Sequence, residues 1–515
     1  TDGPEGGHGV KYKVTGILFA CLMIACALAA SALDQTSGTS RYHQHLEAQA
    51  PQEPCACGGL ELCTHLPIVR IDTSGQEIPG AILRDENDAM VGYSTTASGE
   101  TEILVRIETV EKDGVWHHTS DFADQSASAW FRIRGNSSRN FDKKSYRIKL
   151  VTDASASENL SLPLLGMSPD NDWALHGPFL DKTLMRNYMW MNISAEIMGY
   201  APNVRFCEVI LDGEYQGIYV LMETIKEDEY RVDLSDYEPG SAANSYMLLL
   251  DAAEEGMQIL NNYTWYTHQT EFGEDSSTGF QILYPNAMEL TPAVTDFIQR
   301  DISRIERGLY SADMVLGKYD YAEEIDVESF VDYYILQEFL ANNDAFSRST
   351  YFYRDVRGTL HIGPVWDYNN VLDNFIRPFS FHGFLLANRG WYGRLLTDED
   401  FVRRLITRYR QLRETFLSEE YLSEYIDQVI DYLGPAIERN DAVWGYSYDP
   451  EQVNPHARRV PDENSTLRDV NPASYDDAVA RMKEYLRARG DWMDAHIEEL
   501  LQYCHPSKTA AQRVE

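Results

Sequence analysis

The sequence predicts a bilobed α+β fold, with a strand-rich N-terminal lobe at about residues 66–251 and a helical C-terminal lobe at about residues 290–505. Two patterns predict it. Short runs of strand-forming residues fill the first half, and apolar residues at helical spacing fill the second. The composition agrees with a folded chain, because 43% of the 515 residues are hydrophobic. A space between two such lobes is a common place for a ligand.

The first lobe is expected to hold most of the strands. Alternating or apolar runs predict them at residues 66–72, 103–107, 130–134, 144–150, 206–211, 217–222 and 246–251. Asp212-Gly213 lies between two of these runs, which is a strong hairpin signal. A helix is expected to start near Asp181, which can cap it, and to end at Gly199. The polar segment 252–279 is expected to be a loop or insertion.

Helices are expected to dominate from Pro292 onward, with strong helical patterns at residues 327–340 and 398–503. Between these two patterns, residues 350–363 predict a hairpin. Asp344 follows the helix before the hairpin, and Asp367 follows the hairpin itself. Because a hairpin folds the chain back, we expect both carboxylates to face one pocket.

The two ends of the chain are expected to lie outside the folded lobes. Residues 1–33 contain an almost wholly apolar segment, Val14–Leu33, which is long enough to cross a bilayer at ~20 residues. Ala30-Ser31-Ala32 equally suits cleavage of a signal peptide. Either function predicts an exported protein, secreted or membrane-anchored. Residues 34–65 are expected to form a flexible tether, and residues 506–515 a disordered tail.

Charge and cysteine content narrow the possible partners and compartment. The formal net charge of -37 opposes binding to phosphate backbones, so nucleic acid is excluded as a partner. This charge serves solubility or favours basic protein or peptide partners. Cys55, Cys57 and Cys63 lack a fourth ligand nearby, which zinc normally needs. We therefore expect disulfide bonding, with one thiol left over among the five cysteines beyond the apolar segment.

Two stretches of the sequence carry side chains suited to phosphoryl transfer. One aspartate of such a site accepts the proton of the attacking hydroxyl and the other holds magnesium, which fits Asp344 and Asp367. Asn369 or Asn370 can supply an oxygen co-ligand. The segment 132–150 is a basic strand–loop–strand that can cradle phosphate, although it has no Walker pattern. Aspartate is also common in turns, so spacing alone favours a structural role for both carboxylates.

Taken together, these stretches resemble the CotH kinase family of spore-coat protein H and its relatives. The resemblance spans roughly residues 66–502, with its motifs in the expected order. The matching segments are Arg134-Gly-Asn-Ser-Ser138, Lys143–Leu150, Trp173-Ala-Leu175, Asp181–Asn187, Phe206–Glu223, Asn343-Asp344, Ser349–Tyr353, Gly363–Asn369 and Leu486–Asp494.

The resemblance implies a protein-kinase-like fold that binds ATP with Mg²⁺ or Mn²⁺ and phosphorylates Ser or Thr of protein substrates. It implies that Asp344 is the catalytic-loop aspartate and that Asp367, with Asn369, binds the metal. The residues implied to contact the nucleotide are Arg134, Lys144, Lys149, Arg186 and Glu223. Strand alternation places Lys144 and Lys149 on opposite faces and does not decide between them. Glu223 would contact the adenosine or brace the neighbouring loop.

Some features depart from this pattern and keep other functions open. The sequence has neither His-Arg-Asp nor Asp-Phe-Gly, and it reads Asp373-Asn374 where we expect Gly-Asn in relatives. The extra carboxylate would add a metal ligand or distort the loop. One alternative is a surface binding or adhesion protein that keeps the fold without the chemistry. Another is a glycosidase that uses Asp344 and Asp367 as acid and base.

Overall fold

The computed structural model describes residues 41–59, 61–152, 158–252, 257–265, 267, 278–374, 380 and 382–506. The chain divides into two compact units, Thr1–Tyr42 and His43–Glu515, and the second carries all the features below. The predicted apolar segment Val14–Leu33 and nearly all of the predicted C-terminal tail lie outside the described residues. Among the residues described, no helix combines the length and the apolar character that a membrane crossing requires.

Seven strands of the first half form a closed barrel, in the order β10-β11-β9-β8-β7-β5-β2. Its strands are β2 (Ile68–Asp72), β5 (Ile103–Val110), β7 (Gln125–Ile133), β8 (Tyr146–Val151), β9 (Asp172–His176), β10 (Val204–Leu211) and β11 (Glu214–Glu223). Neighbouring strands are antiparallel except β10 and β2, whose parallel pairing closes the barrel. The predicted strands are confirmed, and so is the Asp212-Gly213 hairpin.

The barrel interior is filled by alternate side chains of its strands. On β8, Tyr146, Ile148 and Leu150 join the buried cluster inside the barrel. Arg147 and Lys149 are only partly buried and alternate with them. Because successive strand residues point to opposite faces, these two cations lie on the outer surface of the barrel. The basic side chains of β8 therefore point away from the apolar core of the barrel.

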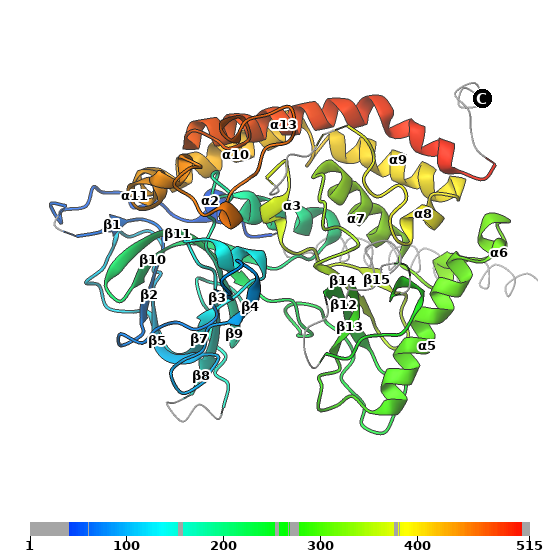
Figure 1. The fold of residues 1–515 in the computed structure, drawn as a ribbon, viewed down its shortest axis with the longest axis horizontal. Coiled ribbons are helices and arrows are strands. Elements are labelled where there is room, and N and C mark those ends of the chain that lie inside the picture. The colour runs from blue at the N-terminus through cyan, green and yellow to red at the C-terminus, as the bar shows by residue number, and fades with distance from the viewer. Residues whose placement is uncertain are drawn as a thin grey trace, which may run out of the picture. The chain divides into compact units, whose positions relative to one another are not determined.

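The second half combines a four-stranded antiparallel sheet with helices. The sheet has the order β13-β12-β14-β15. Its strands are β12 (Tyr246–Ala252), β13 (Thr278–Tyr284), β14 (Thr350–Arg354) and β15 (His361–Ile362). The long helices are α3 (Arg186–Met198), α5 (Pro292–Leu309), α7 (Val327–Phe339), α9 (Glu399–Arg413), α10 (Glu419–Leu433), α11 (Pro435–Trp444) and α13 (Tyr475–His496). In Figure 1, α13 runs alongside α10 and contacts α7 as well.

Shorter elements complete the fold. The short strands are β1 (Cys63–Thr64), β3 (Ile82–Arg84), β4 (Met90–Tyr93) and β6 (His117–His118). The single-turn helices are α2 (Gln44–Glu47), α6 (Ala312–Val315), α8 (Tyr392–Leu395) and α12 (Leu467–Val470). The 3-10 helices are η1 (Ser137–Asn140), η2 (Tyr321–Glu323), η3 (Tyr368–Asn370), η4 (Gly445–Tyr448), η5 (Pro455–Ala457) and η6 (Ile497–Tyr503). The helical C-terminal half is confirmed, and the predicted mixed α+β class holds.

Helix α3 begins later than the sequence predicts. It starts at Arg186, and the expected start near Asp181 is wrong, although its end at Gly199 is confirmed. The Asp181 carboxylate bonds the N–H of Thr183 at 3.0 Å and the N–H of Arg186 at 2.9 Å. Asp181 therefore caps a turn that precedes the helix and also satisfies one of the free N–H groups of its first turn.

The segment before the barrel differs from the expected tether. The Gln44 side chain, at the start of α2, bonds both the N–H and the C=O of Phe206 on β10, at 2.7 and 3.1 Å. His43 and Gln44 are buried, and the His45 ring lies 4.3 Å from the ring of Tyr425 on α10. Composition alone did not reveal these contacts, because the residues that make them are individually polar.

Candidate active site

Asp344 lies in a turn directly after α7. Its N–H donates to the side-chain oxygen of Asn342 at 3.1 Å. Its carbonyl accepts the N–H groups of Ser347 and Arg348 at 3.0 and 2.8 Å. With both backbone groups bonded, the turn fixes the position of the carboxylate between the helix and the strand β14.

Asp367 occupies a strained position just beyond β15. Its backbone has φ 60° and ψ 66°, in the left-handed region that non-glycine residues rarely adopt. Asn187 on α3 holds the following turn from both sides. Its side-chain oxygen accepts the N–H of Tyr368 at 2.8 Å, and its amide donates to the side-chain oxygen of Asn369 at 2.6 Å. The Asn369 amide in turn donates to the Asp367 carboxylate.

The structure brings the two aspartates into one electrostatic neighbourhood. Burial raises the pKa of Asp367 to about 6, together with the negative charges of Asp344 and Asp251 and against the Arg134 charge. Burial also raises the pKa of Asp344, and the negative charge of Asp251 raises it as well. A hydrogen bond from Asn370 opposes this shift. Three carboxylates that disfavour each other's charge form a group that a cation would stabilise.

Asp251 is the acidic residue that sequence reasoning did not assign to the site. It lies near the end of β12, whose Leu250 pairs with Thr350 of β14. Its carboxylate accepts the N–H of Ser349 at 3.1 Å and lies 3.8 Å from the Arg348 guanidinium. The available signal was an aspartate that directly follows a wholly apolar strand. Which strand it would pair with was not evident from the pattern.

Arg134 supplies positive charge beside Asp367. Burial lowers the pKa of the Arg134 guanidinium, and the Asp367 charge acts in the opposite direction. The guanidinium also lies 5.4 Å from the centre of the Trp366 ring. The backbone N–H of Arg134 donates to the Ser145 carbonyl at 2.8 Å, which holds this end of β7 against the segment before β8. A partly buried cation is thus held next to the carboxylate group.

The outer face of the barrel extends this positive charge. Arg132 pairs with Arg147 across β7 and β8, and Lys149 pairs with Trp130 two residues further along. The Arg147 guanidinium binds Asp172 of β9 at 2.7 Å, which offsets one of these charges. Residues of the same parity share one strand face, so this row lies on the same side of β7 as Arg134.

Lys144 lies apart from that row. Its ammonium donates to the Arg139 carbonyl at 2.9 Å, within the loop that joins β7 and β8. Burial lowers the pKa of Lys144, and Asp142 partly offsets the shift. The structure therefore places Lys149, and not Lys144, on the strand face that leads toward Arg134. Direct contact of either lysine with a nucleotide stays a prediction.

Arg186 and Glu223 are both engaged with other parts of the protein. Arg186 forms a buried ion pair with Asp181, and its Nε donates to the Val371 carbonyl at 3.1 Å. The Glu223 carboxylate accepts two N–H groups of Asn203, at 2.8 and 3.0 Å. Arg186 thus supports the loop that follows Asp367, and Glu223 braces the end of β11. Their contact with the nucleotide also stays a prediction.

A pocket of about 540 Å³, lined by both basic and acidic residues, adjoins the loop after Asp367. The cations among its lining residues are Lys182, Arg186, Arg459 and Arg481. Asp373 also lines it, and its carboxylate lies 2.9 Å from the Arg459 guanidinium. This carboxylate, which was expected to add a metal ligand or distort the loop, is directed to an arginine on a different segment.

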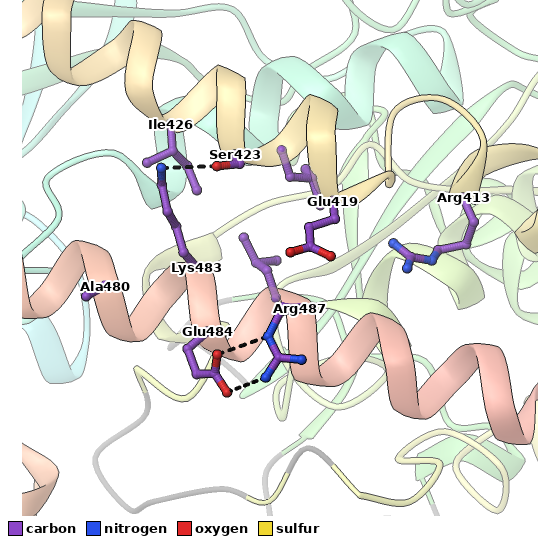
Figure 2. Close-up of a pocket in the computed structure, with 10 residues that line it drawn as sticks. Arg413, Glu419, Ser423, Ile426, Ala480, Lys483, Glu484 and Arg487 are labelled. Carbon is purple, nitrogen blue, oxygen red and sulfur yellow. Dashed lines mark hydrogen bonds and ion pairs between the residues drawn. The ribbon is translucent and has the colours of Figure 1, made fainter.

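A second hollow of about 250 Å³ lies between α10 and α13, and none of the three aspartates lines it. Figure 2 shows Lys483 reaching Ser423 across this hollow, while Glu484 pairs with Arg487 along α13. The Lys483 ammonium also binds Asp427 at 2.6 Å. Because its cations are already paired, this hollow offers little charge for a ligand, and we assign it no chemistry.

The family model described as CotH kinase protein matches residues 131–493, more than half of the chain. The chain belongs to this family. A curated relative, "Inner spore coat protein H" of Bacillus subtilis (strain 168), is 22% identical over 304 residues. That match covers 58% of this chain and 73% of the relative.

The CotH match contains every residue of the candidate site. Arg134 lies near its start, and Asp251, Asp344 and Asp367 lie well inside it. The predicted family membership is therefore confirmed. The match begins after the first strands of the barrel, so residues 41–59 and 61–130 are described by the structure but lie outside the matched region.

Proposed function

We propose that this CotH-family protein is an atypical protein kinase that transfers the γ-phosphate of ATP to Ser or Thr of protein substrates. One observation carries the proposal: the carboxylates of Asp251, Asp344 and Asp367 influence one another's charge, and the Arg134 cation acts on Asp367. Phosphoryl transfer needs acidic groups for the metal and the attacking hydroxyl, with cations for the phosphates. These four side chains supply both.

The donor set fits the divalent metal that such a reaction requires. Magnesium and manganese prefer carboxylate and amide oxygens, and the site consists of those groups. Asp367 and Asp251 would hold the ion, with Asn369 or Asn370 nearby as amide donors. When bound, the metal would neutralise charge on the phosphates of ATP. The raised pKa of Asp367 agrees with this assignment, because it reflects burial and two neighbouring carboxylates whose effect the Arg134 charge only partly offsets.

The chain's own residues would then divide the remaining work. Asp344 would accept the proton of the attacking Ser or Thr hydroxyl, because its turn presents the carboxylate beside Asp367. Arg134 would bind a phosphate oxygen, and Lys149 would extend the positive charge along β8. Asn187 would act as a positioning residue, because it bonds the turn that carries Asp367 and touches none of the reacting groups.

The finer fold assignment belongs to the same proposal. In a bilobed protein-kinase-like arrangement, the barrel would act as the N-terminal lobe. The four-stranded sheet and the helices would act as the C-terminal lobe. Arg134 on the barrel side and the aspartates on the other side support this division. A closed barrel is more than the strand-rich lobe that the sequence predicts, because its closure depends on the parallel pairing of β10 with β2.

Location and substrate are inferred from charge and from the relative's name. The matched relative is described as an inner spore coat protein, which favours a surface structure as the place of action. Export through the N-terminal segment agrees with that place. The net charge of -37 favours basic protein substrates over acidic ones.

A direct assay tests the activity. The purified chain would be incubated with labelled ATP, Mg²⁺ or Mn²⁺, and a basic Ser-rich protein. We expect label on Ser or Thr, and we expect Asp367→Ala to abolish it. Asp296→Ala, which removes an exposed aspartate on α5, is the matched control and should transfer label normally. Transfer that survives Asp367→Ala would contradict the site assignment.

The two alternatives predict different results. A binding or adhesion protein without chemistry would give no transfer and no thermal stabilisation by ATP with metal. A ligand present at ~100 times its dissociation constant should stabilise a nucleotide-binding protein by ~2.7 kcal/mol. A glycosidase would use the aspartates as acid and base, but it gives no role to Arg134 beside Asp367. The kinase proposal gives a role to the aspartates and to Arg134.

A further inference from the structure

Four side chains outside the matched family region gather at one point near the N-terminal end of the barrel. They are Cys55, Cys57, Cys63 and His118, and one ligand atom from each lies within 4.8 Å of all the others. The Cys55 sulfur and the Nε2 atom of His118 are 3.1 Å apart. None of these residues belongs to the candidate active site, which lies further along the chain.

The local fold explains why these residues meet. Cys63 on β1 stands directly opposite His118 on β6 in the antiparallel ladder. Cys55 and Cys57 come from the loop before β1, where Gly58 and Gly59 have φ of 68° and 71°. Such positive φ values are readily adopted by glycine and let the chain turn back after Cys57. The turn and the ladder therefore bring sulfurs and imidazole to one side.

This arrangement corrects the expected disulfide. Cys55, Cys57 and Cys63 are free cysteines in the structure. The fourth ligand that the sequence seemed to lack is His118, which is distant along the chain but adjacent across the β1–β6 pair. Spacing within one segment could not reveal it, because a strand pair formed from separate segments supplies it.

We propose that Cys55, Cys57, Cys63 and His118 bind one zinc ion in a closed structural site. Three thiolates and one imidazole are a common structural zinc donor set, and zinc favours tetrahedral coordination by four such ligands. Tetrahedral geometry at usual zinc–ligand lengths separates two sulfurs by roughly 3.8 Å, and a sulfur and a nitrogen by roughly 3.6 Å. In the structure the Cys55 sulfur and the His118 Nε2 atom are 3.1 Å apart, and no two ligand atoms of the cluster are more than 4.8 Å apart, which brackets these values. Binding would release the thiol protons to solvent.

The surroundings of His118 support this assignment. Its Nδ1 atom lies 3.3 Å from the carboxylate of Asp121, and the same carboxylate accepts its backbone N–H at 2.8 Å. A ligating histidine commonly donates a hydrogen bond from its second ring N–H to a carboxylate. This bond fixes the ring and directs the other nitrogen to the metal. Here the other nitrogen, Nε2, faces Cys55.

Further bonds hold the two segments of the cluster together. Glu61, from the loop between Cys57 and Cys63, accepts the Thr119 hydroxyl at 2.8 Å and the Ser120 N–H at 3.0 Å. The indole N–H of Trp116 donates to the Glu53 carbonyl at 2.7 Å. The bound ion would clip the segment before the barrel to the segment between β5 and β7. Since the protein fills all four positions, its role is structural and not catalytic.

Metal analysis of the full chain tests the proposal. The protein would be purified with excess zinc, dialysed, and measured by inductively coupled plasma mass spectrometry. We expect one zinc per chain, and loss of most of it in Cys55→Ser, Cys63→Ser and His118→Ala. Cys207→Ser and His456→Ala are matched controls, because they remove a cysteine and a histidine outside the cluster. Both should retain the zinc content of the unaltered protein.

A second measurement keeps the test valid if the variants fail to fold. Cobalt would replace zinc in the unaltered chain, and the absorption spectrum would be recorded. Intense visible bands of tetrahedral cobalt, with a near-ultraviolet thiolate-to-cobalt band, would support the site. A weak octahedral spectrum would overturn the proposal. Zinc-free protein that cannot be loaded, or thiol titration showing a disulfide among Cys55, Cys57 and Cys63, would also overturn it.

Discussion

The Asn187 side chain on α3 donates a hydrogen bond to the side-chain oxygen of Asn369, at an N···O distance of 2.6 Å. Its own oxygen accepts the N–H of Tyr368. A buried helix residue thus fixes both residues that follow Asp367, whose left-handed backbone needs support from its surroundings. The proposed metal-binding turn is therefore held by a helix that precedes it by about half of the length of the matched region.

Asn187→Ala should impair catalysis beyond its effect on stability. The loss leaves two partner groups without their bonds, which typically costs ~1–3 kcal/mol of unfolding free energy. Loss of such a supporting contact also lowers activity by roughly 10–100-fold. Asn192→Ala is the matched control: this buried amide on the same helix bonds Tyr425 at 3.2 Å. Activity assays would give kcat for both variants, and unfolding curves would give their stability. Equal losses of kcat in the two variants would contradict a positioning role.

Substitutions of Lys149 and Lys144 should have different effects on the KM for ATP. Lys149 shares a strand face with the basic row near Arg134, whereas Lys144 bonds the Arg139 carbonyl. We expect Lys149→Met to raise KM for ATP roughly tenfold, since a charge-assisted hydrogen bond contributes ~1.5–3 kcal/mol. Lys144→Met should leave KM unchanged and cost only ~1 kcal/mol of stability. The reverse order of KM values would assign the nucleotide to the loop of Lys144.

Much of the fold could be predicted because local patterns determine it. Alternating residues on β8 and the Asp212-Gly213 turn both depend on neighbours a few positions away. Asp344 and Asp367 were also recognisable as a pair, because the hairpin between them lies within one continuous stretch. Local chemistry therefore predicts the strands, the helices and two of the site's carboxylates.

What sequence reasoning missed depends on contacts between distant segments. The barrel closes through the parallel pairing of β10 with β2, which periodicity cannot indicate. Asp251 joins the site because β12 pairs with β14, and His118 joins the cysteines because β6 pairs with β1. In each case a strand supplies one residue to a group whose other members lie elsewhere. Pairing partners are set by the whole fold and not by any single window of sequence.

Asp251→Asn should weaken the binding of the metal that the proposed reaction requires. The substitution removes one negative charge yet keeps an oxygen that can accept the Ser349 N–H. We expect the Mg²⁺ concentration for half-maximal activity to rise roughly 10–100-fold. Arg348→Gln is the control, because it removes the cation 3.8 Å from this carboxylate and leaves the carboxylate in place. An unchanged magnesium requirement in Asp251→Asn would remove Asp251 from the metal site.

Lys182 should make the stability of the protein depend on pH above neutrality. Burial lowers its pKa to about 7, and Asp181, Asp441 and Asp142 only partly offset the shift. In the unfolded chain a lysine has a pKa of about 10.4. Between these two values the unfolded state binds more protons, so the free energy of unfolding rises with pH.

Lys182→Met removes this contribution and keeps a side chain of similar length. The unaltered protein should gain stability relative to the variant as pH rises from about 7 to about 10, by on the order of several kcal/mol. The variant also loses the hydrogen bonds from the Lys182 side chain to the Phe179 carbonyl and the Ser447 hydroxyl. This loss lowers the stability of the variant at every pH. Urea unfolding curves at several pH values would measure the difference, and the exposed Lys318→Met variant should run parallel to the unaltered protein. If Lys182→Met also runs parallel, Lys182 is protonated in the folded state and its ammonium is better compensated than burial implies.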